Sequence, residues 1–281
     1  RLEDMEGLSL TSCRAIVTGA SSGLGAEFAR QLAGRAQAVM LVARRREALV
    51  AVAAELRSLN AELEVEVRCA DLNDAAAVGE IEAGARTFRP NLLINNAGLG
   101  DYGSFESATR EKLRAQMVVN VEALVLLTHA VLPHLSRPGG VLNVGSLAGT
   151  LPMPDLAVYA ASKAFVDRFS EALAVELAGQ GVTVSCVCPG PTPTQFGAQA
   201  RREQGEDTNR SGQELLRIPP EQVVAEALAA LERGRPVHFA GRMVRVAAGF
   251  FQMLPRSILR LLIRRRMAAS GAAAAEREVR R

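Results

Sequence analysis

The sequence predicts a doubly wound α/β domain, with a parallel sheet of about seven strands and a C-terminal helical extension. Apolar runs of strand length alternate with longer helical stretches along most of the chain, the pattern of strand–helix repeats. These runs are solidly apolar, as in strands that are buried on both faces of a sheet. With 281 residues, 48% of them hydrophobic, the chain can form one large domain with a well-buried core.

The elements follow in order along the chain. We expect strands at 13–19, 38–43, 63–70, 91–98, 140–146, 182–190 and 236–241, where the apolar runs lie. Longer periodic stretches predict helices at about 23–35, 46–59, 74–85, 110–135, around 159–163, and 220–234. No repeat or domain-scale linker interrupts this order. The chain therefore divides into an N-terminal tail (1–12), one α/β domain (13–241) and a C-terminal extension (242–281).

Composition narrows the class of protein. No run of eighteen apolar residues suggests a membrane span, and the acidic start "RLEDMEGLSL" does not resemble a secretory signal. Four cysteines lie at no zinc-like or redox spacing, so we expect buried, reduced thiols, no metal site and a cytoplasmic protein. They are Cys13, Cys69, Cys186 and Cys188.

Charge is unevenly distributed. The net charge is +3, but ten arginines against two glutamates give residues 242–281 a balance of +8, which leaves about −5 on the first 241 residues. This mildly acidic body argues against nucleic-acid binding by the domain.

The first strand–helix turn reads "TGASSGLG", from Thr18 to Gly25. Its glycines permit a tight turn, close approach of a pyrophosphate, and close packing of helix and sheet. An ordinary tight turn is the alternative, but this turn follows the first strand and opens the first helix, as a dinucleotide site requires. The spacing G-xxx-G-x-G differs from the G-x-G-x-x-G fingerprint, and the turn lacks the Lys-Ser/Thr ending of a nucleotide-hydrolysing P-loop. We expect cofactor contacts at Gly19, Ser21, Ser22, Gly23, Leu24 and Gly25.

The end of the second strand indicates which dinucleotide binds. An NAD site usually has an acidic residue there, whereas arginine suits the 2′-phosphate of NADP. This chain reads "LVARRREAL", with Ala43 and Arg44 where the acid would fall. Arg44 can stack on the adenine or bind the phosphate, and Arg45 adds positive charge. The alternative is that Arg44–Arg46 merely begin a solvated helix. Because cations replace the carboxylate, we expect NADP(H) in preference to NAD(H).

Tyr159 and Lys163 stand four residues apart in an expected helix, so they share one face. A lysine ammonium one turn from a phenol lowers the phenol pKa toward a useful acid–base range. Ser146 ends the fifth strand, and Asn120 lies in the long fourth helix. These residues, with "TGASSGLG", "NNAG" and "PGPTPT" in the same order, resemble the short-chain dehydrogenase/reductase superfamily from about residue 13 to residue 241.

The resemblance implies a Rossmann-like fold and hydride transfer between a nicotinamide and a carbonyl or alcohol substrate. It implies that Tyr159 transfers the proton, that Lys163 also holds the nicotinamide ribose, that Ser146 binds the substrate oxygen, and that Asn120 anchors a relay water. It also implies further cofactor contacts at Asp71, Leu72, Asn96, Ala97, Gly98, Pro189, Gly190, Thr192 and Thr194. Asp71 has a second interpretation, as a helix cap.

The substrate is less well specified. The polar segment 195–218 occupies the place of a mobile lid, while Leu147, Leu151, Met153 and Leu156 offer an apolar lining. We expect a moderately hydrophobic ketone, aldehyde or secondary alcohol. The alternatives are a 3-oxoacyl thioester and, from another class, a cofactor-sensing binding protein without turnover, which typically lacks the tyrosine or the lysine.

The extension contains "GFFQMLPRSILRLLIRRRM", in which Ile258, Leu259, Leu262 and Ile263 share one helical face. Arg256, Arg260 and Arg264 line another face at four-residue steps. Such a helix suits packing on its own domain, where it could cover the substrate mouth, contact within a homo-dimer or homo-tetramer, or peripheral contact with an anionic membrane. We expect packing in preference to membrane contact.

Overall fold

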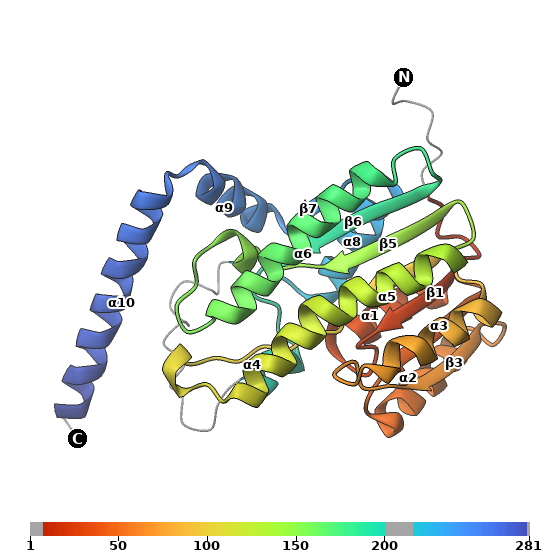
Figure 1. The fold of residues 1–281 in the computed structure, drawn as a ribbon, viewed down its shortest axis with the longest axis horizontal. Coiled ribbons are helices and arrows are strands. Elements are labelled where there is room, and N and C mark those ends of the chain that lie inside the picture. Colours follow the sequence, from red (N-terminus) through yellow and green to blue (C-terminus); the bar gives the residue numbers. More distant parts are fainter. Residues whose placement is uncertain (1–7, 201–215, 280–281) are drawn as a thin grey trace.

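The expected strands form one parallel sheet. The computed structural model describes residues 8–200 and 216–279, and the strand order within that part is β3-β2-β1-β4-β5-β6-β7 (Figure 1). The strands are Arg14–Thr18 (β1), Ala38–Ala43 (β2), Glu64–Cys69 (β3), Leu92–Asn95 (β4), Gly139–Val144 (β5), Val182–Cys188 (β6) and Val237–Phe239 (β7). The predicted doubly wound sheet is confirmed.

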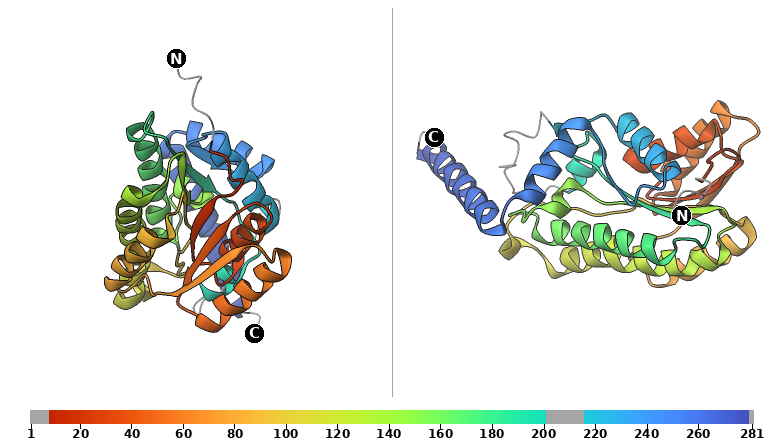
Figure 2. Two further views of the ribbon diagram at one scale, coloured as in Figure 1. Left: turned by 90° about the vertical axis from the view of Figure 1, so that its right-hand side faces the viewer. Right: turned by 90° about the horizontal axis from the view of Figure 1, so that it is seen from above.

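Helices cover both faces of the sheet, as the right-hand view of Figure 2 shows. On one face α1 packs against α2 and α8, and on the other α3 packs against α5, and α4 against α6. The helices are Gly23–Ala33 (α1), Arg46–Leu59 (α2), Ala76–Phe88 (α3), Arg110–Met117 (α4), Ala123–Val131 (α5), Ala157–Glu176 (α6), Gln195–Gln199 (α7), Pro220–Glu232 (α8), Arg242–Met253 (α9) and Arg256–Val279 (α10).

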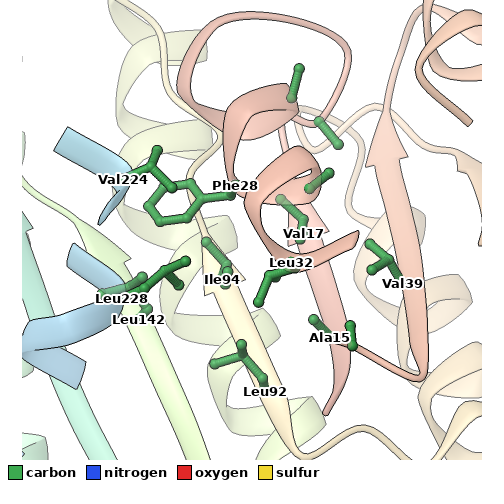
Figure 3. Packing of buried hydrophobic residues seen from close by; sticks show 14 of the residues in the cluster. Ala15, Val17, Phe28, Leu32, Val39, Leu92, Ile94, Leu142, Val224 and Leu228 are labelled. Carbon is green, nitrogen blue, oxygen red and sulfur yellow. The ribbon is translucent and has the colours of Figure 1, made fainter. Parts of the chain in front are cut away.

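The alternation of side chains along each strand supplies both layers of the core. In β1, Ala15 and Val17 pack in the cluster with α1 and α8, whereas Ile16 between them packs in the cluster with α3 and α5. Figure 3 shows side chains of α1 and α8 meeting the strands, with Phe28 of α1 among them. Phe28 has no exposed surface, and full burial of such a ring contributes about 1.5–3 kcal/mol.

Three segments differ from the simple sequence pattern. Leu8 and Leu10, in the expected tail, are 2% and 0% exposed and belong to the core. Strand β3 lies at the edge of the sheet and is partly exposed, which explains its polar residues. The expected helix at 110–135 is interrupted by a π-helical turn at Val118–Glu122, between α4 and α5. Such turns are frequent at functional sites.

The helical run Arg110–His134 is long and apolar enough to cross a membrane by length and composition. However, 44% of its most apolar window is buried within the protein, and α5 packs against α3 and β4. We therefore assign this run to the core. The pair α9 and α10 meets the same test only when taken together, and it is bent by 116°.

The functional groups lie at one end of the sheet. All strands are parallel, so their carboxyl ends lie together at this end, and the strand order reverses between β1 and β4. A crevice at such a reversal is where open α/β sheets bind their ligands. Helices α9 and α10 follow β7 at this end, and α10 extends away from the body (Figure 1).

Candidate active site

The turn between β1 and α1 has the backbone of an anion site. Gly19 has φ +65°, and a Cβ atom on Gly25 would lie 2.2 Å from the Gly19 carbonyl oxygen, so the helix packs directly onto the turn. Ser22 precedes α1 and makes no side-chain capping hydrogen bond. The first N–H groups of α1 therefore remain available for phosphate oxygens.

The "NNAG" segment is fastened to the end of β1. The Thr18 hydroxyl accepts hydrogen bonds from the backbone N–H groups of Asn96 and Ala97, both at 3.0 Å. The Asn96 side chain donates to the Thr18 carbonyl at 2.9 Å, and Asn95 donates to Asn143 of the neighbouring strand β5 at 2.9 Å. Asn95 thus ties β4 to β5. Thr18 was not predicted from the sequence as a residue that shapes the crevice.

Two arginines extend the crevice beyond β2. Arg45 Nη2 donates to the hydroxyls of Ser22 and Ser21, at 3.1 and 3.3 Å. Arg44 Nη1 lies 3.9 Å from Asp71 Oδ2. Arg45, rather than Arg44, is therefore the arginine that contacts the glycine-rich turn.

Asp71 does not cap α3, because the N-cap residue of that helix is Ala75. Asp71 Oδ1 accepts a hydrogen bond from the backbone N–H of Asn73 at 3.0 Å, which orders the turn before α3. Its other oxygen faces Arg44, beside the crevice. Leu72 packs, partly buried, against the core cluster that includes α3.

One cysteine corrects the expectation of four buried thiols. Cys13, Cys186 and Cys188 are buried, but Cys69 is exposed. It ends the edge strand β3, and its thiol donates to the Arg44 carbonyl at 3.1 Å. A strand at the sheet edge leaves its last side chain in contact with solvent, which the apolar sequence pattern did not reveal.

The four expected catalytic residues converge from three elements. Ser146 follows β5, Tyr159 and Lys163 lie on α6, and Asn120 lies in the π-helical turn. A Cβ atom on Gly98 would lie 3.4 Å from Asn120 Oδ1 and 3.5 Å from Lys163 Nζ, so these two groups share one wall. The Ser146 hydroxyl acts on the Tyr159 phenol by lowering its pKa.

Asn120 and Lys163 are held by the backbone. Asn120 Oδ1 accepts from the N–H of Leu99 at 2.7 Å, and its Nδ2 donates to the Leu99 carbonyl at 2.9 Å. Lys163 Nζ donates to the Val144 carbonyl at 2.7 Å and lies 5.9 Å from the centre of the Tyr159 ring. Lys163 is only 5% exposed.

The pKa values of this pair differ from the expectation. Burial raises the pKa of Tyr159, and the hydrogen bond with Ser146 opposes this shift without overcoming it. Burial also lowers the pKa of Lys163. The predicted lowering of the phenol pKa by a neighbouring ammonium is therefore wrong for the chain alone, because the loss of hydration favours the uncharged form of each group.

Beneath Lys163 lies a cluster that sequence reasoning missed. Asp167 Oδ1 accepts hydrogen bonds from the thiols of Cys188 and Cys186, at 3.2 and 3.4 Å. Burial raises the pKa of Asp167 to about 6, and the two thiols and Lys163 oppose that shift. In the described part of the chain these three residues could also hold a metal ion, but protonated thiols that donate to a carboxylate account for their distances.

The segment after β6 lines the other side of the crevice. A Cβ atom on Gly23 would lie 3.3 Å from Thr194, and both residues line a cavity of about 500 Å³. Thr192 Oγ1 donates to the Gly190 carbonyl at 3.1 Å. Pro189 accepts a hydrogen bond from the N–H of Leu147 at 2.9 Å.

Two features of the substrate side differ from the expected lining. Phe196 of α7 stacks obliquely on Tyr159, with ring centres 5.5 Å apart; an aromatic residue just after "PGPTPT" was its only sequence signal. Leu147 packs with Val244 and Ala248 of α9 and is not free to line the site. The remainder of the expected lid, residues 201–215, lies outside the described residues.

Comparisons with known proteins agree with this geometry. The family model for short chain dehydrogenases matches residues 14–205. Sulfoacetaldehyde reductase 2 of Chromohalobacter salexigens is 36% identical over 187 residues, which cover 64% of this chain and 73% of the relative. A very-long-chain 3-oxoacyl-CoA reductase of Podospora anserina is 40% identical over 182 residues, which cover 62% of this chain and 53% of the relative.

A solved structure matches most of the chain. A short-chain dehydrogenase from Sphingobium yanoikuyae in complex with NADPH superimposes with a TM-score of 0.70 at 32% identity, covering 80% of this chain and 86% of that one. Other similar structures contain NADP, NAD or NADH. A nicotinamide cofactor is common to these complexes, and its phosphorylation state differs among them.

Proposed function

The chain belongs to the short-chain dehydrogenase family, and from this premise we propose that it is an NADPH-dependent reductase of moderately hydrophobic ketones or aldehydes. The observation that carries the proposal is the convergence of Asn120, Ser146, Tyr159 and Lys163 at the carboxyl end of β5, beside the crevice between β1 and β4. Family membership makes the chain an oxidoreductase that uses a nicotinamide cofactor on a small-molecule substrate; the residue roles and the preferences below are our proposals.

Carbonyl reduction needs a hydride on carbon and a proton on oxygen. The bound nicotinamide supplies the hydride. Tyr159 gives its hydroxyl proton to the substrate oxygen, and its raised pKa keeps it in the protonated form that can do so. The Ser146 hydroxyl, which lies near enough to Tyr159 to lower its pKa, would donate to the same oxygen as negative charge develops there.

Lys163 and Asn120 complete the proton path. Lys163 Nζ lies beside Gly98 and one helical turn from Tyr159, where it can bind the nicotinamide ribose and return a proton toward the phenol. Asn120 is fixed by two hydrogen bonds to Leu99 inside the π-helical turn, which suits the anchoring of a relay water. Arginine could not replace Lys163, because a planar fork does not fit a pocket built for one ammonium.

The residues of the crevice fit a dinucleotide. The turn at Gly19 and Gly25 leaves no room for side chains, so backbone N–H groups can meet the pyrophosphate. Asp71, Leu72, Asn96, Ala97 and Gly98 are placed to hold the adenosine half. Pro189, Gly190, Thr192 and Thr194 follow β6 on the nicotinamide side.

The preference for NADP(H) is supported by charge. Arg45 donates hydrogen bonds to the neutral hydroxyls of Ser21 and Ser22, and Arg44 lies next to Arg45 after the end of β2. Two cations with hydroxyl donors form a site for the 2′-phosphate, whereas an NAD site would have a carboxylate there. The NADPH complex of the Sphingobium relative agrees with this choice.

The substrate class is inferred from the walls of the site. Phe196 packs against Tyr159, and Leu156 is 5% exposed nearby in the chain, so the surroundings are largely apolar. A 3-oxoacyl thioester is the second candidate, favoured by the Podospora relative, of whose length this chain covers about half. A binding protein without turnover is disfavoured, because the chain keeps all four catalytic side chains.

We also propose a homo-oligomer in the reducing cytoplasm. Leu126 on α5 and Phe165 on α6 are 46% and 41% exposed, and Phe165 stacks on Phe169 with ring centres 5.9 Å apart. This apolar face on the outer helices suits contact with a second copy. Buried Cys186 and Cys188 are free thiols, as a reducing compartment would keep them.

A substrate screen with NADPH tests the function. We expect oxidation of NADPH in the presence of apolar ketones, aldehydes or 3-oxoacyl thioesters, and a loss of about a hundred- to ten-thousandfold in kcat for Tyr159→Phe. Binding of NADPH should persist in this variant. Unchanged turnover in Tyr159→Phe across the panel would refute the assigned role of Tyr159.

A further inference from the structure

We propose that the C-terminal arm, residues 242–268, docks on the surface of an anionic lipid membrane. The arm consists of α9 and the first half of α10, which meet at a bend of 116° and project from the end of the sheet that carries the active site (Figure 1). The proposal is independent of the catalytic assignment, because no residue of the arm belongs to the proposed catalytic or cofactor site.

The first observation is a concentration of exposed apolar side chains. Of the fifteen large apolar side chains that are exposed among the described residues, eight lie between 243 and 267. In α9 they form a stripe at spacings of three and four residues, which is one face of a helix. The stripe is Met243 (49% exposed), Val246 (67%), Phe250 (56%) and Met253 (86%).

The opposite face of α9 is already packed. Val244 and Ala248 are 0% and 1% exposed and contact Leu147 beside the active site. Arg245 Nη1 donates to Glu226 Oε2 of α8 at 2.8 Å. These contacts fix the orientation of α9, so its exposed stripe faces away from the body of its own domain.

Helix α10 shows the same division. Leu259 is 6% exposed, whereas Ile258, Leu261 and Leu262 are 45%, 50% and 46% exposed. The sequence left open whether this helix packs on its own domain, on a second copy or on a membrane. Leu259 is buried and Ile263 is half-buried, whereas the other three side chains remain without cover in the described part of the chain.

Charge selects the membrane among the remaining partners. From 242 to 275 the sequence has seven arginines and no aspartate or glutamate, whereas the first 241 residues carry about −5. Arg256, Arg260 and Arg264 recur every fourth residue along α10, beside its apolar residues, and all three are exposed. Apolar residues flanked by arginines are the composition of helices that lie in the interface of anionic membranes.

A second copy fits this surface less well. A two-fold contact places one patch against itself, so the arginines of both arms would meet with no carboxylate of the arm to pair with them. The apolar face around Leu126 and Phe165 on α5 and α6 is available for subunit contact instead. Docking through the arm would hold the carboxyl end of the sheet, and with it the substrate entrance, close to the bilayer.

Vesicle co-sedimentation of the full chain tests the proposal. Vesicles of phosphatidylglycerol and phosphatidylcholine in equal proportions should bind the protein at low salt, and vesicles of phosphatidylcholine alone should not. High salt should release it, because screening removes the contribution of the arginines. Combined Arg256→Gln, Arg260→Gln and Arg264→Gln should lower the partition coefficient about a hundredfold, at about fivefold for each arginine.

Two further variants separate the partners. Arg110→Gln, Arg233→Gln and Arg235→Gln together remove the same charge from exposed positions on the body and should leave vesicle binding nearly intact. Phe250→Ser with Met253→Ser should weaken it at least tenfold. Absence of binding to the anionic vesicles, or equal loss in the body and arm variants, would overturn the proposal. The proposal would also be overturned if the protein bound no vesicles and formed a dimer that Phe250→Ser with Met253→Ser dissociates.

Discussion

Replacement of Arg45 by alanine should remove most of the proposed preference for NADPH over NADH. In the structure Arg45 donates to Ser21 and Ser22 at 3.3 and 3.1 Å, so its guanidinium is held over the glycine-rich turn by two neutral groups. Arg44 instead lies 3.9 Å from the Asp71 carboxylate, which compensates part of its charge. Arg45 should therefore contribute more than Arg44 to recognition of the 2′-phosphate.

The magnitude follows from the contact that is lost. A hydrogen bond between charged partners contributes about 1.5–3 kcal/mol, which is roughly a ten- to hundredfold change in Kd. The Arg45 side chain is exposed to solvent, so screening places the expected loss of NADPH affinity toward the lower end of this range. The Kd for NADH should hardly change, because NADH has no phosphate at this position.

Fluorescence titration of NADPH and NADH measures both Kd values in the same preparation. Arg46→Ala is the matched control, because it removes the same charge from the next residue, at the start of α2. The control should affect NADPH much less than Arg45→Ala does. Equal Kd values for NADPH and NADH in the native protein would refute the phosphate site, and equal losses in both variants would refute the contact assigned to Arg45.

Three further predictions concern the turn, the substrate wall and the buried acid. Gly25→Ala places a methyl group 2.2 Å from the Gly19 carbonyl oxygen and should weaken the binding of NADPH and NADH alike in the same titration. A methyl group on Gly79 of α3 would meet no atom within 4 Å. Gly79→Ala should therefore raise the free energy of unfolding in urea by about 0.5–1 kcal/mol. Phe196→Ala removes the ring against Tyr159 and should raise KM for an apolar ketone without changing the Kd for NADPH; an unchanged KM would remove Phe196 from the substrate site. The pKa of Asp167 is about 6 in the folded protein, above its ordinary 3.8. Between these two pH values the folded protein binds more protons than the unfolded chain, so its free energy of unfolding falls as pH rises. Urea titrations below and above this pH range should show a smaller fall in Asp167→Asn, and an identical fall would contradict the shift.

Local patterns predicted the helices and strands well where one physical rule dominates. The stretch 46–59 was expected as a helix and is α2 residue for residue, because its apolar spacing and its charged start agree. The long run at 110–135 was expected as one helix, and the π-helical turn at Val118–Glu122 was missed because the apolar periodicity continues through it. Leu8 and Leu10 were assigned to a tail because two apolar residues beyond the first strand form no recognisable element, yet both are buried.

The candidate site shows the same limit at the level of single contacts. Spacing and motif order predicted Ser146, Tyr159 and Lys163 as site residues, since each lies at a fixed place relative to a strand or a helix turn. Sequence order could not show that Arg45 contacts the glycine-rich turn, because this contact depends on how the loops after β1 and β2 approach each other at the carboxyl end of the sheet. Phe196 and the Asp167 cluster were missed for a similar reason: their partners lie far away in sequence.

Spacing also misled us about the protonation of the central pair. Four-residue spacing places the phenol of Tyr159 and the amine of Lys163 on one face, and in water the ammonium would favour the phenolate. The fold buries both groups, and burial raises the pKa of Tyr159 and lowers that of Lys163, each toward its neutral form. A neutral phenol can donate a proton to a carbonyl oxygen, whereas alcohol oxidation would need the phenolate as base.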